Sequence, residues 1–325
     1  EDPRERFEPR RRGLHLMRIA VTGASGHYGR SLTELLLAKV RPSDLILVTR
    51  RPERLKVAAE RGVEIRYGDF DRPDRLPEAF AGSDRLLLIS TLAVGPRRRR
   101  QHLAAVEAAV TAGVRHIAYT SSTGIHPRTP SLAVQDHVFT ENEIRRTGLA
   151  FTFLRDAQYA EVIATMLAPP AVASGKWSMS TGKGCMAFVS KQDCVASAAA
   201  VLTTDGHEGA VYEITGPQLC TFAEAAALAG EISGRPIAYT DVSHEERLAQ
   251  FDALGVPREY VEGMVNADDT GVWGSEEMVS YERAIRQGYF SVCSHHVELL
   301  TGRRAKSLRE VFLEHREALL SSVGS

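Results

Sequence analysis

Cysteine is scarce in this sequence, and its positions exclude two kinds of site. Four cysteines occur in 325 residues, and no two of them form a C-x-x-C pair. Their scatter over Cys185, Cys194, Cys220 and Cys293 indicates neither a zinc site nor a disulfide framework. We therefore predict no metal centre and a reducing, cytoplasmic compartment.

Long apolar runs and a strong net charge are also missing. No run approaches the roughly 18 apolar residues of a membrane span, and residues 1–16 lack the apolar core of a signal peptide. The formal net charge of −1 gives no electrostatic reason to expect nucleic acid. We expect neither a membrane nor a nucleic-acid partner. The arginine-rich residues 1–16 are predicted to be a disordered extension, with a basic docking arm as the alternative.

Three glycines follow the first apolar run. Residues 19–21 have strand length and composition, Gly23, Gly26 and Gly29 come next, and residues 31–40 have helical periodicity. In such a turn the glycines permit a tight bend, the approach of a pyrophosphate to the backbone, and close packing of the helix. The phosphates would lie on free N–H groups at the helix start. The spacing is one residue wider than G-x-G-x-x-G, so a purely structural turn is the alternative.

No acidic residue ends the second predicted strand, residues 44–49. Rossmann folds that prefer NAD place an acid about 20 residues past the glycines, where it accepts from the ribose 2′-OH. Here Arg50 lies 21 residues past Gly29. A guanidinium can bind a 2′-phosphate bidentately, so NADPH is predicted over NADH. Alternatively, Arg50 and Arg51 only begin a solvated helix.

Strands and helices alternate at regular spacing through the first half of the chain. This alternation predicts an α/β fold, a Rossmann doubly wound parallel sheet with helices on both faces and right-handed crossovers. Its ligand site would lie where the strand order reverses. The remaining strands are predicted at 63–67, 85–90, 116–120 and 151–154, and the helices between them at 97–112 and 132–146.

The regularity fades after residue 158. We expect an NADP-binding domain over residues 17–158 and a smaller, mixed α/β C-terminal substrate lobe over 159–325. Residues 190–216 could return to the first domain. Short elements are predicted at 176–179, 187–189, 191–202, 211–214, 222–232 and 237–242, with helical stretches to residue 320.

Polar residues follow several of the predicted strands. Asp69 and Phe70 could meet the adenine through a hydrogen bond and ring packing, although Asp69 could equally cap the next helix. The loop of residues 91–96 would face the ligand. The charge run Arg97–Arg100 is interpreted as a solvated helix face, with phosphate contact as the alternative.

The chain lacks the Tyr-x-x-x-Lys pair that supplies the acid in ordinary short-chain dehydrogenases. The corresponding helix reads Asp136-His-Val-Phe-Thr-Glu-Asn142. A quinone or an extended conjugated cation can accept hydride without that acid, because its electron sink is already delocalised. The absence therefore favours a conjugated substrate.

Two residues are candidate catalytic groups. His137 could protonate a quinone oxygen, or it could be an ordinary helical residue. Asp156 could bind the carboxamide or act as an acid if burial raises its pKa, or it could pair with Arg155 or cap a helix. Val94, Tyr159 and Met186 are the predicted substrate contacts.

Several stretches resemble the NmrA-like, atypical short-chain dehydrogenases. The resemblance extends to the bacterial type 2 NAD(P)H:quinone oxidoreductases and the triphenylmethane reductases, and it covers most of the chain from Met17 to about Leu320. It rests on residues 22–29, 86–90 and 112–121, on Asp136-His137, Gly148 and Leu154-Arg155, and on residues 207–216.

The resemblance implies NADPH as cofactor and a cleft for the substrate. Where the quinone reductases carry Leu-Arg-Asn, this chain has Leu154-Arg155-Asp156, and some relatives have lysine where Asn142 stands. The predicted cofactor-binding residues are the three glycines, Arg50 and a further set that the resemblance implies or that lies at the same edge of the sheet. That set is Ser25, His27, Tyr28, Asp69, Phe70, Ser90, Thr91, Leu92, Tyr119, Thr120, Ser121 and Arg155.

The main hypothesis is an NADPH-dependent oxidoreductase that transfers hydride to a quinone-like or other conjugated or polycyclic small molecule, as a monomer or a homodimer. One alternative is a ketone or enone reductase that tailors a natural product and uses Asp156. The other is a non-catalytic regulator of the NmrA type that senses NADP(H).

Overall fold

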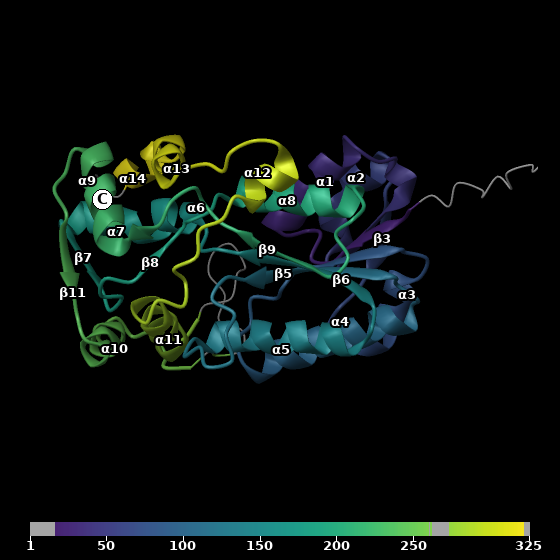
Figure 1. The fold of residues 1–325 in the computed structure, drawn as a ribbon, viewed down its shortest axis with the longest axis horizontal. Helices are drawn as coiled ribbons and strands as arrows, with labels where there is room; N and C mark the ends of the chain where they lie inside the picture. Colours follow the sequence, from purple (N-terminus) through teal and green to yellow (C-terminus); the bar gives the residue numbers. More distant parts are fainter. Residues whose placement is uncertain (1–16, 260, 262–272, 322–325) are drawn as a thin grey trace, which may run out of the picture.

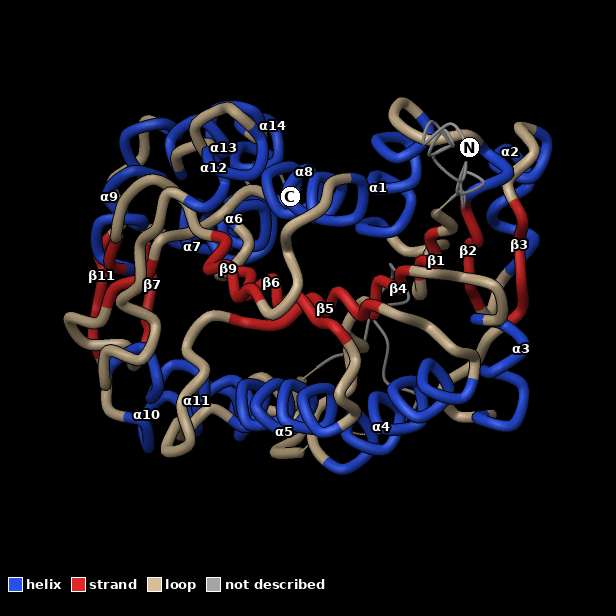
Figure 2. The backbone as a smooth tube through the Cα atoms, turned by 45° about the vertical axis from the view of Figure 1, so that its right-hand side comes forward, coloured by secondary structure: helices blue, strands red, loops and turns tan. Residues whose placement is uncertain are grey.

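A seven-stranded parallel sheet forms the centre of the molecule, in the order β3-β2-β1-β4-β5-β6-β9 (Figures 1 and 2). The computed structural model describes residues 17–259, 261 and 273–321, so the predicted extension of residues 1–16 lies outside it. This sheet confirms the predicted doubly wound fold. Its strands are β1 (Ile19–Val21), β2 (Leu45–Thr49), β3 (Glu64–Tyr67), β4 (Arg85–Leu88), β5 (His116–Ser122), β6 (Ala150–Asp156) and β9 (Ala210–Ile214).

Helices cover both faces of the sheet because successive strand side chains point to opposite faces. In β2, Leu45 and Leu47 pack with the core under one helical layer, whereas Ile46 and Val48 pack with the core under the other. The first layer contains α1 (His27–Leu37), α2 (Lys56–Glu60), α8 (Lys191–Thr203) and α12 (His296–Thr301) (Figure 2). The second contains α3 (Leu76–Phe80), α4 (Pro96–Thr111) and α5 (Leu132–Arg146).

The second half of the chain forms a lobe with its own core. Its two small sheets pair β8 (Cys185–Met186) with β10 (Cys220–Thr221), and β7 (Lys176–Met179) with β11 (Ala238–Asp241). Its helices are α6 (Ala160–Val162), α7 (Ala168–Ser174), α9 (Phe222–Ser233), α10 (His244–Ala253), α11 (Ser275–Arg286), α13 (Leu308–Glu314) and α14 (Arg316–Ser321). Within the described ranges, no helix is both long and apolar enough to cross a membrane.

Two predicted elements differ from the structure, and one open question is answered. The first helix begins at His27 rather than Ser31, because extended Gly26 starts it directly at the glycine turn. The short element predicted at residues 187–189 is absent: β8 ends at Met186, and Val189 makes only a single bridge to Tyr159. The segment around 190–216 does return to the first half, since β9 pairs with β6.

Candidate functional site

The strand order reverses between β1 and β4, and the glycine turn follows β1 at that point. Gly23 has φ of +59°, and a Cβ on Gly29 would lie 2.5 Å from the Ala24 Cα. Gly26 caps α1 without a side-chain hydrogen bond, and the first turn holds no acidic residue. Among the described residues, Gly26 supplies no side-chain cap to the first amides of α1, and these amides fit a phosphate group.

A hydroxyl pair ties the glycine turn to the end of β2. The Ser25 Oγ lies 2.6 Å from the Thr49 Oγ1, which also accepts from the Arg51 backbone N at 3.0 Å. Sequence reasoning missed Thr49, although its signal was a hydroxyl as the last residue of a buried strand. Arg50 follows it and is exposed at the carboxyl edge, as its predicted role requires.

The segment after β3 forms a polar turn. The Asp69 Oδ1 accepts from the Asp71 N at 3.0 Å, so Asp69 closes a local turn and caps no helix. The Asp71 carboxylate accepts from the Arg97 Nη2 at 2.8 Å and the Gln101 Nε2 at 3.0 Å. Phe70 packs half-buried against the core. Part of the arginine run is therefore ion-paired at this edge rather than simply solvated.

Two predicted ligand contacts lie in the interior instead. Tyr119 is 0% exposed, and its Oη lies 2.7 Å from the His137 Nδ1. The His137 Nε2 is 3.3 Å from the Arg98 Nη1. Burial, with Arg98 beside it, holds the pKa of His137 well below its ordinary value. Because His137 is neutral and bonded at both ring nitrogens, this placement argues against the predicted proton transfer to substrate.

Arg155 and Ser121 both bind Glu141 of α5. The guanidinium makes two bonds of 2.8 Å to Glu141 and one of 3.0 Å to Glu213, and the Ser121 Oγ donates to the Glu141 Oε1 at 2.8 Å. Both side chains therefore have protein partners, and contact of Ser121 and Arg155 with a cofactor stays a prediction. The same contacts show that Asp156 is not the partner of Arg155.

Two of the three predicted substrate contacts are also buried. Met186 is 1% exposed and belongs to the core of the second lobe, and Val94 is 7% exposed at the start of α4. Their side chains are largely enclosed by protein, and their contact with a substrate stays a prediction. Tyr159 remains half-buried at the carboxyl edge, where its Oη donates to the Asp156 Oδ2 at 3.3 Å.

Asp156 ends β6 with a carboxyl group that the protein only partly satisfies. Its side chain is buried, and its Oδ1 has no hydrogen-bond partner among the described residues. Burial raises its pKa to about 7. Close by, the Tyr28 Oη donates to the backbone O of Cys194 at 3.1 Å. A buried carboxyl that is half protonated near neutrality can supply a proton at the edge where a cofactor would lie.

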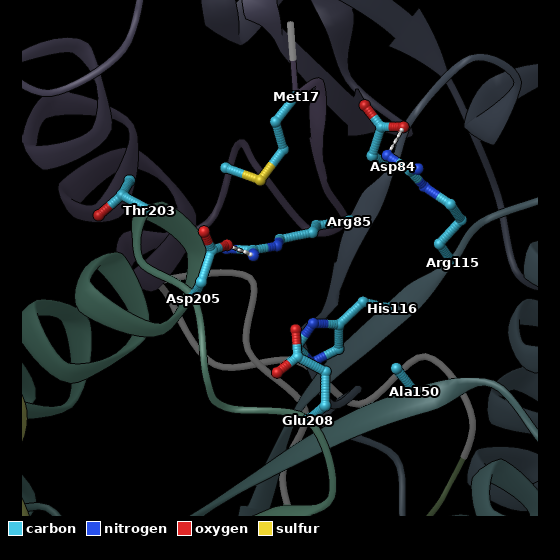
Figure 3. A pocket seen from close by; sticks show the side chains of 9 residues that line it. All are labelled: Met17, Asp84, Arg85, Arg115, His116, Ala150, Thr203, Asp205 and Glu208. Atoms are coloured by element: carbon cyan, nitrogen blue, oxygen red, sulfur yellow. Dashed lines mark hydrogen bonds and ion pairs between the residues drawn. The ribbon is translucent and has the colours of Figure 1, made fainter. Parts of the chain in front are cut away.

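A cavity of about 470 Å³ lies at the opposite edge of the sheet, where the strands begin (Figure 3). Its charged side chains are mostly paired, as Arg85 is with Asp205 and Arg115 with Asp84. It is separate from the residues described above. Its lining residues are Met17, Asp84, Arg85, Arg115, His116, Ala150, Thr203, Asp205 and Glu208.

Comparisons with known proteins identify the family of this chain. The family model described as NAD(P)H-binding matches residues 23–168. Quinone oxidoreductase 2 of Escherichia coli (strain K12) is 34% identical over 251 residues, which cover 77% of this chain and 86% of that protein. The chain belongs to the NmrA-like NAD(P)H-binding reductases.

Solved structures of other NmrA-like reductases have the same fold over nearly their whole length. An NADPH-dependent quinone oxidoreductase from Escherichia coli, complexed with NADPH, matches with a TM-score of 0.81 and 29% identity over 91% of this chain and 99% of that one. The Citrobacter triphenylmethane reductase complexed with NADP(H) matches with a TM-score of 0.78 and 33% identity over 91% and 99%. This NmrA-like reductase is an NAD(P)H-dependent oxidoreductase.

Proposed function

We propose that this protein is an NADPH-dependent reductase that transfers hydride to a quinone-like or other conjugated small molecule. The related quinone oxidoreductase and triphenylmethane reductase support this class of acceptor. The observation that carries the proposal is Asp156, a buried acid with an unpartnered oxygen at the carboxyl edge of the sheet.

Different groups of the protein bind different parts of the cofactor in this proposal. The N-terminal amides of α1 hold the pyrophosphate, for which Gly23 and Gly26 leave room. Arg50 binds the 2′-phosphate, and this bond selects NADPH over NADH. The described part of residues 159–325, apart from α8, β9 and α12 on the central sheet, forms the substrate side.

When bound, NADPH supplies the hydride. Asp156 supplies the proton: in its neutral form it donates to the acceptor oxygen that gains charge as the hydride arrives. Its carboxylate then regains a proton from solvent, and Tyr159 orients it through the bond to Oδ2. The net change is loss of one hydride from NADPH and gain of one hydride and one proton by the acceptor.

The test follows NADPH absorbance with a panel of quinones across pH. We expect turnover that declines above about pH 7, where Asp156 loses its proton. Asp156→Asn should be slower and should lack this decline. Absence of NADPH oxidation with every acceptor would contradict the proposal, and NADP(H) binding without turnover would favour a sensor instead.

A second candidate, reduction of a ketone or enone, is favoured by the same carboxyl group. A carbonyl outside a quinone ring is a poorer electrophile, so its reduction depends more strongly on a proton donor. If enones rather than quinones were reduced, and Asp156→Asn abolished the reaction, this candidate would be preferred.

A further inference from the structure

The loop that follows β4, residues 89–95, is held by side chains from four other segments: the turn after β1, strand β5, and helices α4 and α5. Four of its backbone N–H groups donate to buried side-chain acceptors. The bonds are Ile89 N to Thr22 Oγ1 at 2.9 Å, Ser90 N to Thr120 Oγ1 at 2.8 Å, Thr91 N to His102 Nε2 at 3.0 Å, and Gly95 N to Asp136 Oδ2 at 2.6 Å.

His102 is fixed in a single tautomer by these bonds. A backbone N–H can only donate, so the His102 Nε2 accepts and its Nδ1 carries the proton. That Nδ1 lies 2.9 Å from the Thr140 Oγ1, whose hydroxyl donates to the Asp136 O at 2.8 Å. His102 is 0% exposed, and burial, with Arg98 nearby, holds its pKa well below the ordinary value. The acceptor that Thr91 needs is therefore always present in the folded protein.

The loop lies directly beside the glycine turn. A Cβ on Gly23 would lie 3.6 Å from the Ile89 Cβ, so the two loops are in contact on either side of the point where the strand order reverses. The N–H groups of Ile89, Ser90 and Thr91 donate to protein side chains, so these three amides are not available to a phosphate group. The position of this part of the loop sets the space beside the glycine turn.

We infer that His102 is a positioning residue for the cofactor, acting through the Thr91 amide. This rests on the proposed function and on the sequence-based prediction that Ser90, Thr91 and Leu92 contact the cofactor. Without the Nε2 acceptor, the Thr91 N–H loses its partner, and the loop must move toward water to recover one. That movement shifts the loop relative to the glycine turn, which Ile89 contacts, and does not touch Asp156.

The variants His102→Leu and His102→Gln test this inference. Loss of one such acceptor should raise the KM for NADPH by roughly tenfold, with kcat changed less than about threefold. Glutamine offers an amide oxygen in place of the Nε2, so His102→Gln should return the KM to within about threefold of the wild type. The KM effect and its rescue are not expected from a residue that only supports the fold.

His116 provides a matched control at the other edge of the sheet (Figure 3). It is also buried, and its Nε2 lies 2.8 Å from the Thr152 Oγ1. We expect His116→Leu to lower the thermal stability and to leave the KM for NADPH unchanged. If His102→Leu behaved in the same way, with lower stability and an unchanged KM, the inference would be overturned.

The rate of hydrogen exchange at the Thr91 amide reports whether the bond from Thr91 N to His102 Nε2 is formed, and the measurement needs no cofactor. Exchange should be at least about tenfold faster in His102→Leu and slow again in His102→Gln. Titration of the wild-type protein with NADPH, in the absence of a hydride-accepting substrate, tests the proposed cofactor binding separately from the His102 bond. Fast Thr91 exchange in His102→Leu together with a wild-type KM would show that the bond exists but does not position the cofactor.

Discussion

Replacing Asp156 by asparagine should stabilise the protein at alkaline pH and have little effect at acid pH. The burial that raises the pKa of Asp156 from its ordinary 3.8 to about 7 penalises the charged carboxylate in the folded state. In the unfolded chain the same group ionises near its ordinary pKa. The folded protein therefore loses stability as pH rises from about 4 to 7, and the loss is complete above 7.

The size of this loss follows from the two pKa values. Raising the pKa from 3.8 to about 7 corresponds to roughly 4 kcal/mol of unfolding free energy, at about 1.4 kcal/mol for each pKa unit. Asparagine carries no charge at any of these pH values, and its amide oxygen can accept from Tyr159 as the Asp156 Oδ2 does. The full difference should thus appear as extra stability of Asp156→Asn at pH 8.

Urea unfolding of both proteins at several pH values between 4 and 8 measures this difference. Effects of pH on other groups cancel because only the difference between variant and wild type is used. Asp74→Asn, which changes an exposed aspartate outside the site, controls for the generic removal of one carboxylate. A difference that is constant with pH, or an Asp156→Asn protein less stable than the wild type at pH 8, would refute the reasoning.

Three further predictions concern the cofactor edge. Arg50→Leu should weaken NADPH binding roughly 10- to 100-fold by calorimetry and leave NADH unaffected; equal losses would point to a folding defect. Asp71→Asn, which removes a carboxylate held by Arg97 near Arg50, should tighten NADPH but not NADH by up to about fivefold; no change would show that Asp71 is too distant. Gly29→Ala should cost about 2–3 kcal/mol in urea unfolding, since its Cβ would overlap Ala24; a wild-type midpoint would disprove that contact.

Local sequence signals predicted most of the sheet and its helices. The helix expected over residues 132–146 matches α5, because Ser131 caps its start and Arg145 and Arg146 occupy its last turn. The short element expected at 187–189 did not form: Phe188 packs in the core of the second lobe, Val189 packs in the core under α1, and the segment has only a single bridge, to Tyr159. Apolar runs predict burial well but cannot specify the pairing partner.

The candidate site was predictable only in part. Asp156 and Arg50 could be identified because each ends a strand, and strand ends meet at one edge of a parallel sheet. The partners of Arg155 and His137 depend on how α5 packs against the sheet, which no local pattern encodes. His102 was missed for the same reason: its role is set by a hydrogen bond to a loop 11 residues away.

Calorimetric titration of the purified protein with NADPH and, separately, with NADH tests the central claim most directly. The account predicts saturable NADPH binding at least about tenfold tighter than NADH binding, because only NADPH offers the 2′-phosphate that Arg50 would hold. Adding a quinone to the NADPH-loaded protein in the same cell should then release the heat of turnover. Failure to bind either dinucleotide, or equal affinity for both, would contradict it.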